Sequence, residues 1–120
     1  IQNIKLNPNN LLEVPDIRFF VSSPDSFLTP GNRTLDFSIA SIYLIQGGNA
    51  DITLSNLAER QSVGIVFSST GSSYTINWLG ETIRWSNSLL PTPTPDASKY
   101  DYYSFQKVGG IVLGFSSLNH

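Results

Sequence analysis

The chain has 120 residues, of which 40% are hydrophobic and only 13% are charged, and its net charge is −2. This length suits a single domain, and the seven scattered basic residues form no patch for a nucleic-acid backbone. The absence of cysteine excludes a disulfide framework and thiolate chemistry, and no apolar run approaches the roughly 20 residues that would insert into a membrane.

The first 34 residues differ from the remainder because prolines divide them into short pieces. Only residues 17–21 resemble a strand. We therefore predict an extended N-terminal arm or connector over residues 1–34 and a β-sandwich domain over residues 35–120. The chain contains no methionine, even at position 1, so we expect a processed chain or a piece of a longer protein.

Residues 35–46 read as one strand with an apolar face on either side of its second half. Alternation places one set of apolar residues on a common face, and this set is Leu35, Phe37, Ile39, Tyr43 and Ile45. Ile42 and Leu44 add apolar side chains to the opposite face. A strand that is apolar on both faces must be covered on both sides, by the arm or by another subunit. The predicted subunit-interface residues are therefore Ile42, Tyr43, Leu44 and Ile45.

Short β-rich runs continue to the end of the chain, separated by Gly, Asn, Ser and Asp. Residues 63–67 and 74–78 flank a Ser- and Gly-rich turn, which indicates a hairpin. Residues 91–95 form a proline-punctuated loop that we expect to be exposed. A final hairpin turns at Gly109 and Gly110. This rhythm predicts an all-β fold, an antiparallel β-sandwich or jelly roll of about seven to eight strands.

The sequence offers little for catalysis or for a metal or cofactor. His120 is the only histidine and ends the chain, so no third group is placed to orient it as a base. Asp96 and Asp101 flank the proline loop, and we expect both to be solvated at the surface. We therefore predict no enzyme, no metal site and no cofactor.

Aromatic residues are the best candidates for ligand binding. Tyr100 and Tyr102 share one parity, whereas Tyr103 and Phe105 share the other, so at least one tyrosine must face away from the core. Exposed aromatic rings stack on sugars or fill interfaces. The predicted ligand-binding residues are Tyr100, Tyr102 and Trp85. Core packing is the competing interpretation for Trp85, because it continues the alternation that begins at Ile83.

An ordered series of short motifs runs through the chain from Asn49 to Phe115. They are Ile52–Asn56, Gln61–Val63, Thr75–Trp78, Ile83–Trp85, Pro91, Tyr103–Phe105 and Gly109–Gly110. This series resembles a domain found in bacteriophage tail, fibre and other virion proteins. The resemblance implies a small β-sandwich module that decorates or terminates a fibre, commonly as a trimer.

These observations leave three alternative functions, in decreasing order of support. The first is a non-enzymatic structural module of a virion (tail, fibre or capsid decoration), a homotrimer that contacts other virion proteins and attaches to the host surface. The second is a carbohydrate-binding domain that recognises a host-surface glycan through the tyrosine-rich strand. The third is a capsule-degrading enzyme, which is disfavoured because no acid, base or nucleophile is placed by local spacing.

Overall fold

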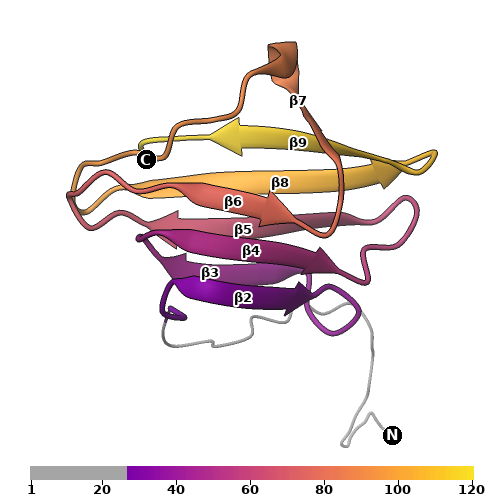
Figure 1. The fold of residues 1–120 in the computed structure, drawn as a ribbon, viewed down its shortest axis with the longest axis horizontal. Helices are drawn as coiled ribbons and strands as arrows, with labels where there is room; N and C mark the ends of the chain where they lie inside the picture. The colour runs from indigo at the N-terminus through magenta and orange to yellow at the C-terminus, as the bar shows by residue number, and fades with distance from the viewer. Residues whose placement is uncertain (1–26) are drawn as a thin grey trace, which may run out of the picture.

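A computed structural model describes residues 27–120, which form two β-sheets packed face to face (Figure 1). The smaller sheet has the order β2-β4-β6, with β2 at Gly31–Asp36, β4 at Ala50–Ser55 and β6 at Ile76–Leu79. The larger has the order β3-β5-β8-β9-β7, with β3 at Ile42–Gln46, β5 at Ser62–Ser68, β7 at Ile83–Trp85, β8 at Tyr100–Val108 and β9 at Ile111–Ser117. A 3₁₀ turn, η1 (Ser86–Ser88), follows β7. The predicted all-β sandwich of seven to eight strands is confirmed.

The chain winds between the two sheets as a flattened coil. From β2 to β7 successive strands belong alternately to the smaller and the larger sheet. The pairs β2–β4, β4–β6, β3–β5 and β7–β9 are parallel, and only β5–β8 and β8–β9 are antiparallel. The expected antiparallel arrangement is therefore wrong for four of these six pairs. In the pairs β2–β4, β4–β6 and β3–β5 the connection passes through a strand of the opposite sheet, which replaces the tight turn of a hairpin, whereas β7 and β9 are connected through β8 of their own sheet.

Two of the expected elements differ from the structure for this reason. The segments predicted as a hairpin over residues 63–78 are β5 and β6, which lie in different sheets. The run 35–46 is divided between β2 and β3. The first strand ends because the Asp36 carboxylate accepts hydrogen bonds from the backbone N–H and the hydroxyl of Ser38, at 2.9 and 2.6 Å, which closes an Asx turn.

The final hairpin forms as predicted. β8 and β9 are antiparallel, and Gly109 and Gly110 connect them with φ angles of +61° and +77°. Two consecutive positive φ angles define the turn whose twist matches that of the flanking strands, and glycine adopts them without strain. The chain ends beside this hairpin, where the backbones of Tyr100 and His120 exchange two hydrogen bonds.

The core lies between the two sheets and is rich in aromatic rings. Its fully buried side chains come from both layers, and the largest of them are Tyr103, Phe67, Phe105, Leu35, Ile45, Ile52, Ile65 and Val112. Within residues 27–120 the first strand starts at Gly31, before the predicted domain boundary at residue 35, and Leu28 bridges to Ile45 in parallel. Most of the predicted arm, residues 1–26, lies outside the described residues.

Candidate functional site

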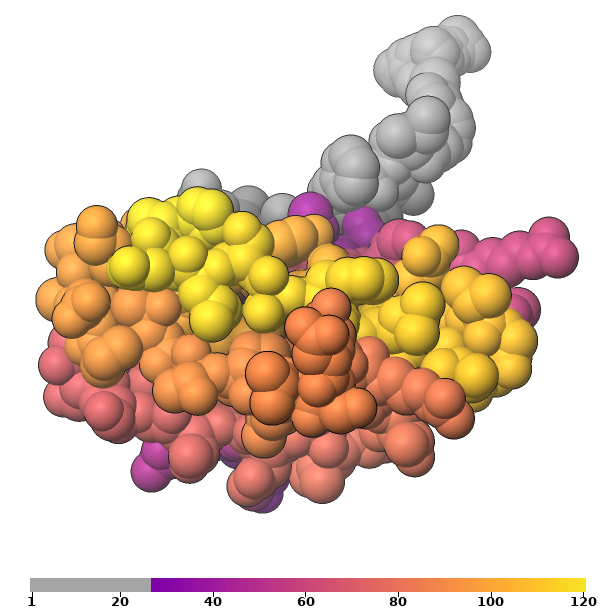
Figure 2. Space-filling model, turned by 90° about the horizontal axis from the view of Figure 1, so that it is seen from above, coloured from indigo at the N-terminus to yellow at the C-terminus, as the bar shows by residue number. Residues whose placement is uncertain are grey.

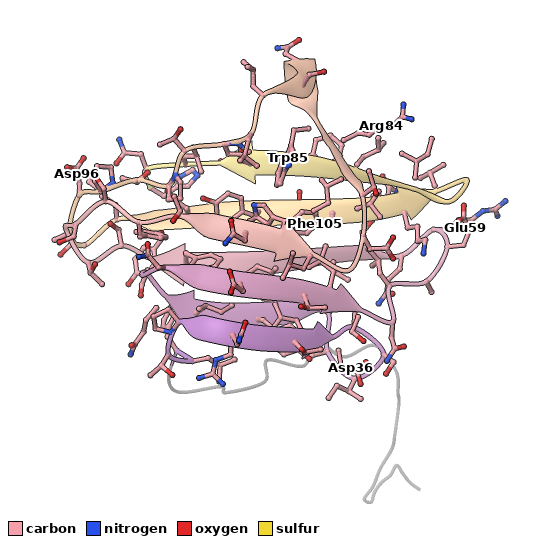
Figure 3. The ribbon with its side chains drawn as sticks, in the orientation of Figure 1. Asp36, Glu59, Arg84, Trp85, Asp96 and Phe105 are labelled. Atoms are coloured by element: carbon pink, nitrogen blue, oxygen red, sulfur yellow. The ribbon has the colours of Figure 1, made fainter. Side chains whose placement is uncertain are left out.

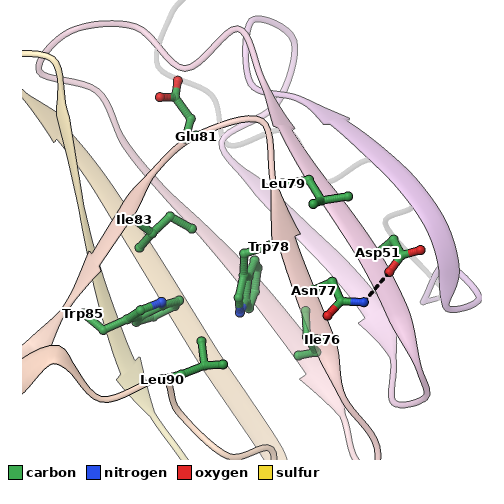
Figure 4. A pocket seen from close by; sticks show the side chains of 9 residues that line it. All are labelled: Asp51, Ile76, Asn77, Trp78, Leu79, Glu81, Ile83, Trp85 and Leu90. Carbon is green, nitrogen blue, oxygen red and sulfur yellow. Dashed lines mark hydrogen bonds between the residues drawn. The ribbon is translucent and has the colours of Figure 1, made fainter.

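A groove lies between β6 and β7, each of which is an edge strand of its own sheet. The chain passes from one to the other through residues 80–82, so the two edges border the same opening of the sandwich. The groove has a volume of about 560 Å³, within the range of small-molecule sites. Its lining, drawn in Figure 4, consists of Asp51, Ile76, Asn77, Trp78, Leu79, Glu81, Ile83, Trp85 and Leu90.

Two tryptophans form the floor of this groove. Trp78 on β6 and Trp85 on β7 are half-buried, and their ring centroids are 5.7 Å apart at an interplanar angle of 55°. Trp78 also packs against Tyr103 and Phe105, with centroid distances of 5.2 Å to each. Trp85 packs against Phe105, with ring centroids 5.6 Å apart, and Figure 3 labels both residues on the larger sheet. Each indole therefore rests on the core and keeps part of its surface in the groove.

Polar groups border the tryptophans on the side of the smaller sheet. Asp51 and Asn77 are directly paired across β4 and β6, and the Asn77 amide donates a 2.7 Å hydrogen bond to Asp51 Oδ1. At the other end, Glu81 Oε2 lies 3.0 Å from Lys107 Nζ, so an ion pair neutralises this carboxylate. The groove combines an aromatic floor with a carboxylate and an amide that point to solvent. Such a combination can bind a ligand that has both apolar faces and hydroxyl groups.

The outer faces of the two sheets differ in their chemistry. On the smaller sheet Asn32, Asp51 and Asn77 form a cross-strand row, and Thr34, Thr53 and Leu79 form the next, in which Leu79 is the one apolar residue. On the larger sheet, the outward positions of β3, β5, β8 and β9 carry no charged side chain. Their apolar residues are Ile42, Leu44, Val66, Tyr100, Tyr102, Val108, Ile111, Leu113 and Phe115. We call this surface the apolar outer face.

The structure separates the predicted ligand-binding residues. Tyr100 and Tyr102 are exposed and lie on the apolar outer face. Trp85 lies on the inner side of the same sheet, in the groove. The three residues thus do not meet in one place, and the tyrosines are associated with the outer face alone.

The predicted subunit-interface residues are divided in the same way. Ile42 and Leu44 point outward and are half-buried. Tyr43 and Ile45 belong to the core, where they are almost completely buried. Of the four residues, only Ile42 and Leu44 contribute side chains to the apolar outer face.

A scan against protein-family models and searches of curated proteins and of solved structures found no match to this chain. Among residues 27–120 no group of three or more histidine or carboxylate side chains could hold a metal ion, and no helix there is long and apolar enough to cross a membrane.

A buried carboxylate lies at the base of the proline loop, contrary to expectation. Asp101 is fully buried, whereas Asp96 is exposed as predicted. The Asp101 carboxylate accepts hydrogen bonds from the backbone N–H and the hydroxyl of Thr94, at 2.7 and 2.6 Å, and from the Asn119 N–H at 2.9 Å. Three donors replace the lost water, because a buried charge must be fully hydrogen-bonded. Asp101 thereby joins the proline loop and the C-terminal segment to β8, and Thr94 in this loop is buried too.

Two buried tyrosines lie near this carboxylate. Burial, reinforced by the negative charge of Asp101, raises the pKa of Tyr74 to about 12 and raises that of Tyr103 further. Neither hydroxyl has a hydrogen-bond partner among residues 27–120. Both phenols therefore stay neutral over the physiological range, and their role is packing around Phe67, whose ring centroid lies 6.2 Å from that of Tyr74.

Sequence reasoning missed the polar members of the groove. Asp51, Asn77 and Glu81 belong to no local motif that would connect them in the sequence. Asp51 and Asn77 are 26 positions apart and become neighbours only because β4 and β6 pair in parallel. The one local signal was the similar alternation of the two strands, in which both residues precede an inward-facing side chain.

Proposed function

We propose that this chain is a non-enzymatic structural module of a virion that works through association of identical copies. The observation that carries this proposal is the contrast between the polar outer face of the smaller sheet and the apolar outer face of the larger sheet. A monomeric sandwich would expose this charge-free apolar surface to solvent, whereas association with another copy would bury it. Large exposed apolar patches mark interaction sites.

The composition of the apolar outer face supports a protein partner. Phe115, Tyr102 and Tyr100 are exposed there, and aromatic residues are enriched at the centres of interfaces while charged residues are depleted. Complete burial of a side chain such as that of Phe115 contributes about 1.5–3 kcal/mol relative to exposure. Arg84, on the edge strand β7, is the one charged residue at an outward strand position of the larger sheet within residues 27–120. The apolar outer face thus has a charged residue at its rim and none at its centre, which is the distribution found in protein–protein interfaces.

A virion and a trimer are proposed from the resemblance to phage tail and fibre domains. Most of the motifs that carry it fall in or beside the strands β4, β5, β6, β7 and β8, and the other two are Pro91 in the loop before β8 and the turn at Gly109 and Gly110. In such an assembly, closed rotational symmetry lets each copy present the same face to its neighbours. Other virion proteins and the host surface would be its further partners.

The test is the mass of the native protein in solution, measured by light scattering over a wide concentration range, for the wild type and two variants. Phe115→Asp places a charge on the apolar outer face. Leu79→Asp places the same charge on the opposite face, at a residue that is equally exposed (45% against 46%). We expect a trimer or larger oligomer for the wild type and for Leu79→Asp, and a monomer for Phe115→Asp, because a buried unpaired charge is costly.

Each outcome has a direct meaning for the proposal. A wild-type monomer at every concentration would overturn it. An oligomer that resists Phe115→Asp but is dissociated by Leu79→Asp would place the interface on the smaller sheet and overturn it in its present form. Thermal unfolding of both variants shows whether they keep the fold of the wild type.

A further inference from the structure

We propose that the groove floored by Trp78 and Trp85 is a binding site for neutral saccharides, in which the two indoles stack against one pyranose ring and Asp51 and Asn77, on the outer side of β4 and β6, bind hydroxyl groups of the same saccharide. This site lies on the opposite side of the larger sheet from the apolar outer face, and the proposal does not depend on oligomerisation.

The aromatic floor supplies the surface against which a sugar ring packs. Trp78 and Trp85 touch each other at a tilt, so they form one bent aromatic surface that continues into Ile76 and Ile83. Their far sides are held by Tyr103 and Phe105, which fixes the rings before a ligand arrives. A rigid aromatic platform loses little conformational entropy on binding. The C–H groups on one face of a pyranose offer the matching apolar surface.

The polar border supplies the groups that recognise hydroxyls. Asp51 uses one carboxylate oxygen to accept from Asn77, and this bond fixes both side chains at the rim of the groove. The second carboxylate oxygen of Asp51 and the amide oxygen of Asn77 remain acceptors, and planar acceptors with fixed directions suit the divergent hydroxyls of a sugar. On the same sheet face Asn32 continues the row that starts at Asn77, and a smaller hollow of about 310 Å³ beside it has Asn32, Asn49, Asp51, Thr75 and Asn77 in its lining. A chain of several sugar units can extend along this row.

The charge of the site selects the class of saccharide. Asp51 is the one carboxylate of the groove lining without a cationic partner in the described residues, since Glu81 pairs with Lys107. No arginine or lysine lines the groove. An acidic sugar would therefore meet a like charge with nothing to compensate it, which disfavours uronic and sialic acids. We commit to neutral hexose-type glycans.

The groove is open to ligands at its outer rim. Leu90 at the rim is 61% exposed, and it faces the indoles across the opening (Figure 4). In Figure 2 the orange segment around η1 stands out from this edge of the sandwich, between the yellow C-terminal residues and the salmon residues of the smaller sheet. Leu90 therefore forms an apolar wall on one side of the opening, against which a bound ring can pack.

The experiment uses the tryptophans themselves as the probe. They are the only two in the chain, so their fluorescence reports on the groove alone. Cellohexaose, maltohexaose and chitohexaose are titrated as neutral probes, and hexagalacturonate as the acidic probe, after a screen of the full chain on a glycan array. We expect a saturable change in emission with at least one neutral probe or one neutral glycan found on the array, and none with hexagalacturonate.

Matched variants locate the site. Asp51→Ala removes the carboxylate and should weaken binding about tenfold or more, since a charged hydrogen bond is lost. Thr53→Ala, on the same strand and the same outward face, should leave the affinity unchanged because Thr53 does not line the groove. Leu90→Ser should weaken binding several-fold, whereas Leu89→Ser, at a neighbour that is 69% exposed but outside the groove, should not.

The alternatives are decided by the same data. Binding of no neutral saccharide by either method overturns the proposal, and so does equal or stronger binding of hexagalacturonate. A neutral saccharide whose affinity is unaffected by both Asp51→Ala and Leu90→Ser binds elsewhere, which also overturns it. Because oligomer mass is measured separately, a failure here leaves the assembly proposal untouched, and a monomer that binds saccharide would support this inference alone.

Discussion

The phenol ring of Tyr102 lies directly over Gly64, on the apolar outer face of the larger sheet. A Cβ atom added to Gly64 would come within 2.5 Å of the Tyr102 hydroxyl oxygen and 2.6 Å of its ring carbon Cε1. The two residues are diagonal neighbours, since Gly64 pairs with Ser104 and Val66 pairs with Tyr102. The missing side chain of the glycine thus provides the space in which the aromatic ring lies flat on the sheet.

Gly64→Ala should destabilise the protein by about 1–3 kcal/mol, the usual cost of forcing extra atoms into a packed site. The Tyr102 ring would have to leave the sheet surface. Chemical denaturation measures the change in the free energy of unfolding.

A double-mutant cycle tests the cause. In the background of Tyr102→Ser the same Gly64→Ala change should cost much less, with a coupling energy of at least about 0.5 kcal/mol. Strictly additive effects would show that the ring does not depend on the glycine.

Asp101→Asn should destabilise the fold by about 3 kcal/mol, because the buried carboxylate accepts three hydrogen bonds and an amide can replace only one of its oxygens. The new amide nitrogen would face either the N–H of Thr94, which donates to Oδ2 in the wild type, or the hydroxyl of Thr94 and the N–H of Asn119, which donate to Oδ1. Asp96→Asn is the control, since Asp96 lies in the same connection but is exposed, and we expect a change within about 0.5 kcal/mol. Equal stabilities of the two variants, measured by denaturation, would contradict the role of Asp101 as an anchor of the loop.

Tyr74 should make the protein sensitive to alkali. Its folded-state pKa is raised from 10.0 to about 12 by burial and by the charge of Asp101, so the folded state favours the neutral phenol. This contribution to stability is complete below pH 10 and is lost as the pH rises through about 12. In Tyr74→Phe the free energy of unfolding should fall less steeply over that interval. A decline identical to that of the wild type would show that Tyr74 is not responsible.

The faces of the strands could be predicted from sequence because side-chain direction is a local property. Alternation correctly placed Tyr43 and Ile45 opposite Ile42 and Leu44, and it correctly separated Tyr103 from Tyr102. The Gly-Gly turn of the last hairpin was also predictable, since its geometry depends on two adjacent residues.

The parallel pairing of the strands could not be predicted, because each pair of parallel partners has another strand between its members in the sequence. The first residues of β4 and β6, Ala50 and Ile76, are directly paired, and no turn motif in the intervening 25 positions indicates this pairing. The groove depends on this pairing, so the sequence alone does not indicate that Asp51 and Asn77 are neighbours. The end of the first strand could not be predicted either. Phe37 continues the inward alternation of Leu35, although the strand has already ended at Asp36.

The burial of Asp101 is indicated by the sequence pattern of β8. It shares its parity with Tyr103 and Phe105, which face the core. A carboxylate at an inward position needs donors from elsewhere in the chain. The alternation of β8 alone therefore indicates a buried, hydrogen-bonded carboxylate, whereas its donors, Thr94 and Asn119, follow only from the folded structure.

Glu59 should make the β8–β9 turn sensitive to acid. Its carboxylate accepts hydrogen bonds from the backbone N–H groups of Gly109 and Gly110, the latter at 3.1 Å, and these bonds hold the pKa of Glu59 below its ordinary value of 4.5. Figure 3 shows Glu59 at the end of the molecule where this turn lies. A lowered folded-state pKa means that the stabilisation is complete above the ordinary pKa and is lost as the pH falls through the folded-state value.

Nuclear magnetic resonance can follow this titration at the turn itself. The amide proton shifts of Gly109 and Gly110 should titrate together with a midpoint below pH 4.5, because both N–H groups lose an ionised acceptor when Glu59 is protonated. Glu59→Gln should abolish the titration while the Gly114 amide, within β9, stays unchanged and serves as the internal reference. A midpoint at or above 4.5 would mean that the carboxylate gains nothing from the turn, and persistence of the titration in Glu59→Gln would assign it to another group. With the expected result, the loop that contains Glu59 acts as a clamp that holds the tip of the last hairpin.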